Sequence, residues 1–115
     1  MSLAVKRIYD EPDPADGFRL LVDRLWPRGV TKERAALDLW LKEVGPSTEL
    51  RTWFHAHPEA FDEFAQRYRA ELKTNPAVDR LRELDARERR VTLLYSVRDP
   101  VHNHAEVLAA FLDGG

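Results

Sequence analysis

The pattern of hydrophobic and polar positions predicts two strands, a run of helices, a third strand and a last helix. Apolar and β-branched residues over 4–9, and a nearly continuous apolar run over 18–26, predict two strands joined by a turn-rich loop. A third strand is predicted over 91–97. Continuous apolar character is typical of strands that are buried on both faces, as in a parallel sheet.

Helices are predicted between the second and third strands, each beginning at a residue that commonly caps a helix. The first is expected to follow Thr31, because apolar residues then recur along one helical stripe at Leu37, Trp40, Leu41 and Val44. Three more are expected to begin at cap residues, two of which precede a proline: Ser47, His57 and Asn75. A last helix is expected after Asn103, which forms a capping-box pattern with Glu106.

This order of elements predicts a small three-layer α/β domain with a short, mostly parallel sheet covered by helices. The strand over 91–97 is reached through helices, so it is most simply parallel to the strand over 18–26. The direction of the first strand stays open, because the short loop after it permits a hairpin as readily as a crossover. The length of 115 residues predicts a single domain over 1–115.

Composition excludes several kinds of chemistry. The chain has no cysteine, which excludes disulfides, thiolate metal sites, iron–sulfur clusters and a cysteine nucleophile. Its 18 basic and 20 acidic residues give a net charge of −2, so no overall basic field attracts nucleic acid. With 43% hydrophobic residues and no apolar run long enough to cross a bilayer, we expect a cytoplasmic protein with no membrane partner.

The histidines are poorly spaced for a metal site. The pairs His55-x-His57 and His102-x-His104 would lie about 200° apart on a helix, and neither has a nearby carboxylate in a recognised motif. The chain also lacks a glycine-rich phosphate loop and a G-x-S-x-G nucleophile motif. We therefore expect no tightly bound metal and no cofactor.

Candidate site residues follow the second and third strands. Ligands of parallel α/β sheets bind beyond the carboxyl ends of the strands, where these segments should converge. Arg24 or Arg28 would hold a carboxylate or phosphate, and Asp23 would orient an arginine. Trp26 and Tyr95 would form the walls of the pocket.

His104 is the candidate for proton transfer, because it falls in the first turn of the last helix and titrates near neutral pH. Asn103 precedes it at a helix N-terminus, which favours an anion. Each residue also has a structural interpretation. Asp23 would pair with an arginine, Asn103 would serve wholly as a cap, His104 would satisfy the helix end or a carboxylate, and Trp26 would belong to the core.

The sequence therefore predicts a small anionic ligand at the carboxyl ends of the second and third strands, with Asp23 and His104 as the catalytic candidates. The alternative is a non-catalytic module that binds protein or nucleic acid through an arginine-rich helical face. That face would consist of Arg67, Arg69, Lys73, Arg80, Arg82, Arg87, Arg89 and Arg90. Interleaved acidic residues favour a solvated surface there, so nucleic acid is the less favoured partner. Catalysis and oligomeric state stay open.

Several segments together form a specific pattern: L-V-D-R-L-W-P-R-G over 21–29, W-L-K-E over 40–43, L-R-x-W-F over 50–54, V-T-L-L-Y over 91–95 and N-H-A over 103–105. This pattern resembles the domain-of-unknown-function 488 family in its short YeaO-like branch. The resemblance implies a compact α/β protein of bacterial type and supplies no reaction. Longer relatives carry a cysteine and a C-H-R group where this chain has Tyr95 and 102–104, so their thiol chemistry does not carry over.

Overall fold

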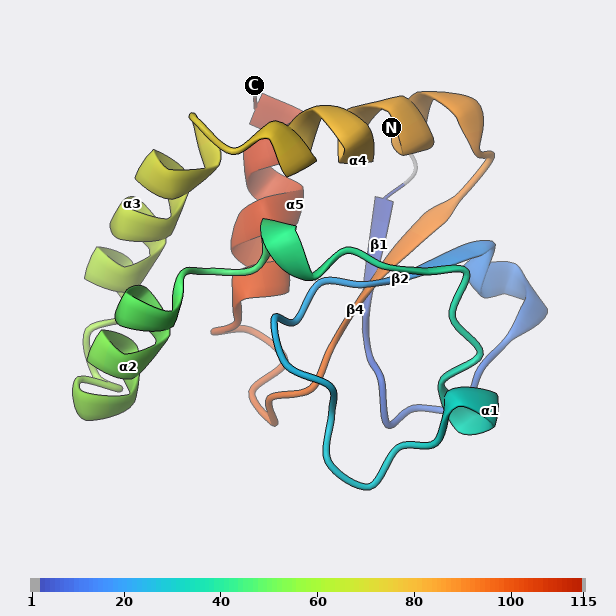
Figure 1. Cartoon of the computed structure of the whole chain (residues 1–115), viewed down its shortest axis with the longest axis horizontal. Coiled ribbons are helices and arrows are strands. Elements are labelled where there is room, and N and C mark those ends of the chain that lie inside the picture. The colour runs from blue at the N-terminus through green and yellow to red at the C-terminus, as the bar shows by residue number, and fades with distance from the viewer. Residues whose placement is uncertain (1–2, 115) are drawn as a thin grey trace.

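A four-stranded parallel sheet forms the centre of the protein, in a computed structural model that describes residues 3–114 (Figure 1). The strands are β1 (Leu3–Arg7), β2 (Phe18–Leu21), β3 (Leu39–Trp40) and β4 (Val91–Tyr95), in the spatial order β1-β4-β2-β3. All five residues of β4 are buried. The parallel pairing of β4 with β2 confirms the prediction for these two strands. β1 is also parallel to β4, which settles the direction that the sequence left open.

Within residues 3–114, five helices accompany the sheet: α1 (Lys32–Ala35), α2 (Thr48–Ala56), α3 (Phe61–Leu72), α4 (Pro76–Arg87) and α5 (His104–Gly114). Short 3-10 turns lie at Pro14–Asp16 and Lys42–Val44. Four of the predicted caps are confirmed, since side-chain oxygens accept hydrogen bonds from backbone N–H groups in the first turns of α1, α2, α4 and α5; the cap residues are Thr31, Ser47, Asn75 and Asn103.

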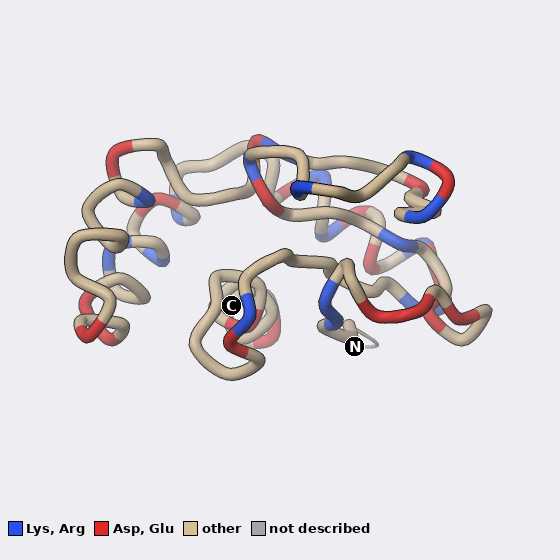
Figure 2. The backbone as a smooth tube through the Cα atoms, turned by 90° about the horizontal axis from the view of Figure 1, so that it is seen from below, with Lys and Arg blue, Asp and Glu red and all other residues tan. Residues whose placement is uncertain are grey.

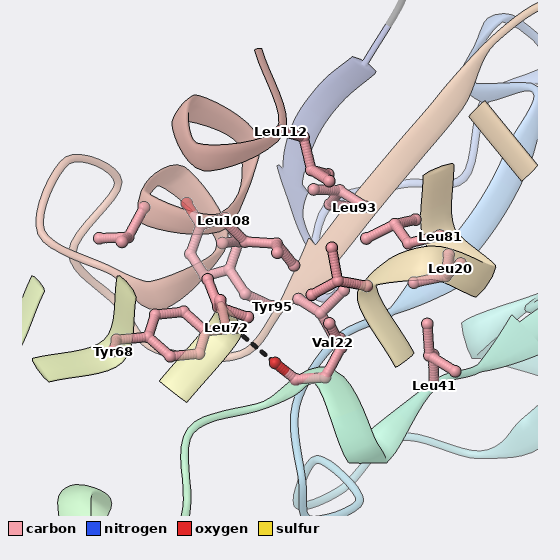
Figure 3. Close-up of a cluster of buried hydrophobic side chains, with 14 of the residues drawn as sticks. Leu20, Val22, Leu41, Tyr68, Leu72, Leu81, Leu93, Tyr95, Leu108 and Leu112 are labelled. Carbon is pink, nitrogen blue, oxygen red and sulfur yellow. Dashed lines mark hydrogen bonds between the residues drawn. The ribbon is translucent and has the colours of Figure 1, made fainter. Parts of the chain in front are cut away.

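The main core lies where α3, α4 and α5 cover one face of the sheet (Figure 3). Each element contributes buried side chains, among them Leu20, Leu93, Leu72, Leu81 and Leu108. Tyr68 is fully buried in this core, and its hydroxyl donates a 2.6 Å hydrogen bond to the Val44 carbonyl. The small α/β domain with a parallel sheet is thereby confirmed.

The opposite face carries a smaller core under α1 and the loops on either side of it. Leu21 and Leu94 from the sheet pack there with Ile8, which directly follows β1, and Trp26 and Trp40 lie at the margin. The two indole rings meet edge to face, with 5.3 Å between their centroids. The third layer is therefore thin, because one turn of helix and loop segments supply it.

The predicted helix over 31–44 is wrong. α1 ends after Ala35 because Ala36 adopts the left-handed conformation with φ of 49°, and the chain then extends as β3. β3 pairs with the edge of β2, and the N–H groups of Asp38 and Leu41 donate to the carbonyls of Arg19 and Leu21. Hydrogen bonding to an open strand edge therefore overrides the helical periodicity.

Several predicted boundaries also differ from the structure, and among them β1 ends at Arg7 rather than Tyr9 and β4 at Tyr95 rather than Val97. β2 ends at Leu21 rather than Trp26. The next two carbonyls, of Val22 and Asp23, accept hydrogen bonds from the side chains of His104 and Trp40. α3 begins at Phe61 rather than after His57. His57 instead ends α2, where its ring Nδ1 donates to the Trp53 carbonyl at 2.9 Å and the two rings stack.

Candidate functional site

A cleft of about 830 Å³ opens where the loops after β1, β2 and β4 meet the junction of α2 and α3. The three strands run in parallel, so their carboxyl ends lie at the same edge of the sheet (Figure 1). The structure brings six of the sequence-predicted site residues to this cleft: Asp23, Arg24, Trp26, Arg28, Asn103 and His104.

Asp23 lies at the base of the cleft and is only 8% exposed. The predicted arginine partner is wrong, because the hydroxyl of Ser96 donates to one carboxylate oxygen and the His104 ring faces the other. Arg24 follows directly on the chain and its guanidinium is directed to the opposite side, toward the loop before α2. A hydroxyl and an imidazole, both after β4, therefore meet the carboxylate instead.

His104 connects α5 to the segment that follows β2. Its Nε2 atom lies 3.1 Å from Asp23 Oδ1 and 3.2 Å from the carbonyl oxygen of Val22, and the ring edge rests on Tyr68. The hydrogen bond is directed to the carbonyl, which leaves Asp23 Oδ1 buried without a hydrogen bond of its own. Its charge is balanced only when the imidazole is protonated.

The order of these three groups decides what chemistry they can perform. A serine is activated as a nucleophile when a histidine lies between it and a carboxylate, because the histidine then accepts the hydroxyl proton. Here the Asp23 carboxylate lies between Ser96 and His104. This arrangement connects the segments after β2 and β4 and differs from the serine–histidine–carboxylate order of a catalytic triad.

Arg24 and Asn103 are largely occupied by structural contacts. The Arg24 guanidinium donates to the carbonyls of Pro46 and Gly45, both at 2.9 Å, and so holds the loop before α2. Asn103 is 2% exposed, accepts from the Glu106 N–H and donates to the Asp99 carbonyl. Both residues support the site rather than offer free donors to a ligand.

Arg28 and Arg51 differ from Arg24 because their guanidinium groups are free. Within residues 3–114, neither guanidinium has a hydrogen-bond or ion-pair partner, although both side chains line the cleft. Arg28 is exposed on the loop after β2, and Arg51 is half-buried in the first turn of α2. The Tyr9 hydroxyl donates to the Arg28 carbonyl at 2.8 Å, and this hydrogen bond fixes the position of the loop after β2.

The two predicted walls of the pocket have different locations. Trp26 lines the cleft, and its indole N–H donates to the Val30 carbonyl at 2.7 Å. Tyr95 is 3% exposed and belongs to the main core instead, so its predicted place in the wall is wrong (Figure 3). Side chains alternate between the two faces of β4, and this alternation directs Tyr95 toward α5. Burial raises the pKa of its hydroxyl.

The loop between β4 and α5 is organised around Asp99. The backbone N–H groups of His102 and Val101 donate to its carboxylate at 3.0 and 2.9 Å, and the His102 ring does so at 2.9 Å. These hydrogen bonds lower the pKa of the Asp99 carboxyl to about 2. The Asp99 carboxylate thus accepts hydrogen bonds from donors of its own loop.

Sequence reasoning missed Arg51, Ser96 and the aromatic residues of α2 and α3 as parts of the cleft. Arg51 has a detectable signal, because it belongs to the L-R-x-W-F segment and follows a helix cap by four residues. No periodicity could place Phe54 and Phe61 beside the loops after β2 and β4. Among the described residues, no group of three or more metal-binding side chains occurs, and no helix is long and apolar enough to span a membrane.

Replacing His104 with alanine is expected to lower the free energy of unfolding by about 1–3 kcal/mol, because Val22 loses its donor and Asp23 becomes a buried charge with one partner fewer. Denaturant unfolding followed by circular dichroism measures this loss. His55→Ala is the control, since His55 is an exposed residue of the same cleft, and its effect should stay within about 0.5 kcal/mol. Equal losses in the two variants would contradict the structural role of His104.

Comparison with known proteins agrees with this fold and sequence pattern. The chain belongs to the family described as the inactive DUF488-N3 subclade, whose model matches residues 2–114. This finding confirms the resemblance to the domain-of-unknown-function 488 family.

Curated relatives extend over nearly the whole chain. The uncharacterized protein Rv3073c of Mycobacterium tuberculosis (strain ATCC 25618 / H37Rv) is 47% identical over 110 residues, which cover 96% of this chain and 92% of that protein. The uncharacterized protein YeaO of Escherichia coli (strain K12) is 45% identical over 112 residues, or 97% of each chain. No solved structure matches the chain.

Proposed function

We propose that this protein binds a small anionic ligand in the cleft at the carboxyl edge of the sheet. The observation that carries the proposal is the pair of free guanidinium groups, Arg28 and Arg51, on the walls of a cleft large enough for a small molecule. A planar guanidinium matches the geometry of a carboxylate or phosphate with two parallel N–H donors.

The carboxylates of the cleft do not compete for these two arginines. Asp23 is held by Ser96 and faces His104, and Asp99 is held by the backbone of its own loop. Among the described residues, the remaining acid of the cleft lining, Glu59, is exposed at the junction between α2 and α3 and has no ion pair with either arginine. The carboxylates of Asp23 and Asp99 thus have partners other than Arg28 and Arg51, which leaves these two cationic groups to a ligand.

The proposal assigns binding, and no chemical step, to the cleft. Asp23 and His104 are positioning residues in this scheme, because they join the loops that carry the ligand contacts. The carboxylate between Ser96 and His104 leaves the serine without a histidine as its base. The description of the family as inactive supports binding without turnover.

The alternative, an arginine-rich binding face on α3 and α4, has less support. Arg67 pairs with Glu63 and stacks on Trp53, Arg82 donates to the Leu112 carbonyl, and these contacts occupy both side chains. Figure 2 shows basic and acidic positions intermixed along the chain rather than gathered on one face. A mixed surface of this kind is typical of a solvated exterior.

The proposal predicts that anionic metabolites raise the melting temperature in a saturable way, as measured by thermal shift with a library of carboxylates and phosphates. Arg28→Met and Arg51→Met should each weaken a bound member of that library about tenfold, or roughly 1.4 kcal/mol. The matched control is Arg80→Met, which removes an exposed arginine of α4 that does not line the cleft. Unchanged affinity in both cleft variants would overturn the proposal.

A further inference from the structure

The size of the cleft indicates a ligand that is more than an inorganic ion. Its volume of about 830 Å³ is many times the roughly 30 Å³ that a water molecule occupies in the liquid, and a simple oxyanion is only a few times larger than water. A phosphate or carboxylate held by Arg28 or Arg51 would leave most of this space to the rest of the ligand.

The remaining wall of the cleft is aromatic. Phe54 and Phe61 lie on it as half-buried side chains, and behind them Phe64 stacks on Phe54 with 4.5 Å between the ring centroids. Trp26 lies on the side of the loop after β2, half-buried, with its N–H already bonded to the Val30 carbonyl. The ring surfaces that face the cleft therefore offer a ligand apolar contact rather than hydrogen bonds.

Exposed apolar side chains gather at the mouth of the same cleft. Among the described residues, the large hydrophobic side chains that are exposed are Tyr9 (38%), Leu25 (59%), Val97 (47%) and Val101 (63%). The first three line this cleft, and the fourth lies on the loop between β4 and α5. Apolar surface concentrated around one opening marks a binding site, because burial of that surface on binding is favourable.

We infer that the ligand of this cleft is an aryl oxyanion, in which a planar ring system carries a phosphate or carboxylate. The inference rests on the proposed function and specifies its ligand class. The oxyanion binds the free guanidinium groups of Arg28 and Arg51, and the ring lies between the aromatic wall and the apolar residues at the mouth. No bond is made or broken in this scheme.

The test compares three phosphates of similar head group and increasing ring size: inorganic phosphate, phenyl phosphate and 1-naphthyl phosphate. Isothermal titration calorimetry at fixed pH and ionic strength measures each dissociation constant for the full chain. Affinity should rise about tenfold with the first ring and rise again with the second, because each ring buries more apolar surface. 1-Naphthoate distinguishes a carboxylate from a phosphate head group, and binding of either one supports the inference.

Variants at the mouth separate the ring contacts from the charge contacts. The double variant Leu25→Ser/Val97→Ser should weaken 1-naphthyl phosphate about fivefold or more and leave inorganic phosphate unchanged. Both positions are exposed, so the fold should tolerate them. Val101→Ser is the matched control, because it removes an exposed valine that does not line the cleft, and it should change neither affinity.

The outcomes distinguish failure of this inference from failure of the proposed function. Phosphate binding that depends on the arginines but does not improve with ring size overturns the aryl assignment and leaves the proposed function standing. Binding of neutral 1-naphthol as tight as that of 1-naphthyl phosphate, unaffected by Arg28→Met and Arg51→Met, overturns the anionic ligand itself. Absence of binding by all of these probes overturns the aryl assignment.

Discussion

Replacing Asp16 with alanine is expected to lower the free energy of unfolding by about 3 kcal/mol, because it leaves a buried arginine without its counter-ion. The Asp16 carboxylate accepts hydrogen bonds from Lys6 Nζ at 3.1 Å, from the Asp13 N–H at 3.0 Å and from the Arg19 guanidinium. The Arg19 side chain is only 6% exposed. Its remaining hydrogen bonds go to the carbonyls of Ala35 and Ala36, which carry no net charge.

Denaturant unfolding near neutral pH measures this loss. The control is Glu63→Ala, which removes the partner of Arg67 in an ion pair whose side chains are about half exposed. Solvent screens such a pair, and its loss should change the free energy of unfolding by only about 0.5 kcal/mol. A similar small change in Asp16→Ala would show that the buried pair does not stabilise the fold.

The same residue predicts a dependence of stability on pH. Burial raises the pKa of the Asp16 carboxyl, but hydrogen bonds from Asp13, Lys6 and Arg19 outweigh burial and leave its pKa below the ordinary value of 3.8. A carboxyl whose pKa is lowered by folding stabilises the protein above its unfolded pKa, and this contribution is lost as the pH falls through the folded pKa. The wild type should therefore lose more stability than Asp16→Ala between about pH 5 and about pH 2.

Replacing Gly17 with alanine is expected to lower the free energy of unfolding by about 3 kcal/mol, for steric reasons. Gly17 has φ of +67°, and a Cβ atom there would lie 2.5 Å from the carbonyl oxygen of Arg90 and 2.9 Å from its Cβ. That carbonyl accepts the Phe18 N–H at 2.9 Å where β2 begins beside β4. Alanine at position 17 would therefore have a strained φ and would also displace the backbone of Arg90.

Gly29→Ala isolates the contribution of the backbone angle. Gly29 has φ of +77°, and a Cβ atom there would meet nothing within 4 Å. Its replacement should cost only about 1–2 kcal/mol, the strain of a left-handed alanine. Thermal and denaturant unfolding of both variants compare the two sites. A Gly17→Ala protein no less stable than the Gly29→Ala protein would mean that the contact with Arg90 relaxes without cost.

The local pattern predicted the elements that are either fully buried or clearly capped. β4 was found because a mostly apolar, β-branched run has few alternatives to a central strand, and α2, α4 and α5 begin where Ser47, Asn75 and Asn103 cap them. The helix predicted over 31–44 failed because the residues of β3 satisfy a helical period as well as an extended one. The deciding factor was the open edge of β2, which lies outside the window that periodicity considers.

The location of the candidate site was predicted from the sequence, but only some of its residues were. Parallel strands determine that the segments after β2 and β4 meet, and they bring Arg24, Arg28 and His104 to one cleft. The partner of Asp23 was not predictable, because Ser96 lies 73 residues away along the chain and neither residue has a local signal for the other. Arg51 lies in the cleft because α2 packs beside loops that are distant in sequence.

The sequence by itself determined which residues carry charge, which segments are apolar and where the capped helices begin, since these properties depend on side chains and near neighbours. The tertiary structure decided which charges stay free. Arg24 and Arg28 are four residues apart on one loop, yet the Arg24 guanidinium is bonded to the carbonyls of Gly45 and Pro46, whereas the Arg28 guanidinium is free for a ligand. Hydrogen bonding by a side chain depends on the groups that folding brings within about 3 Å, and most of these groups are remote in sequence.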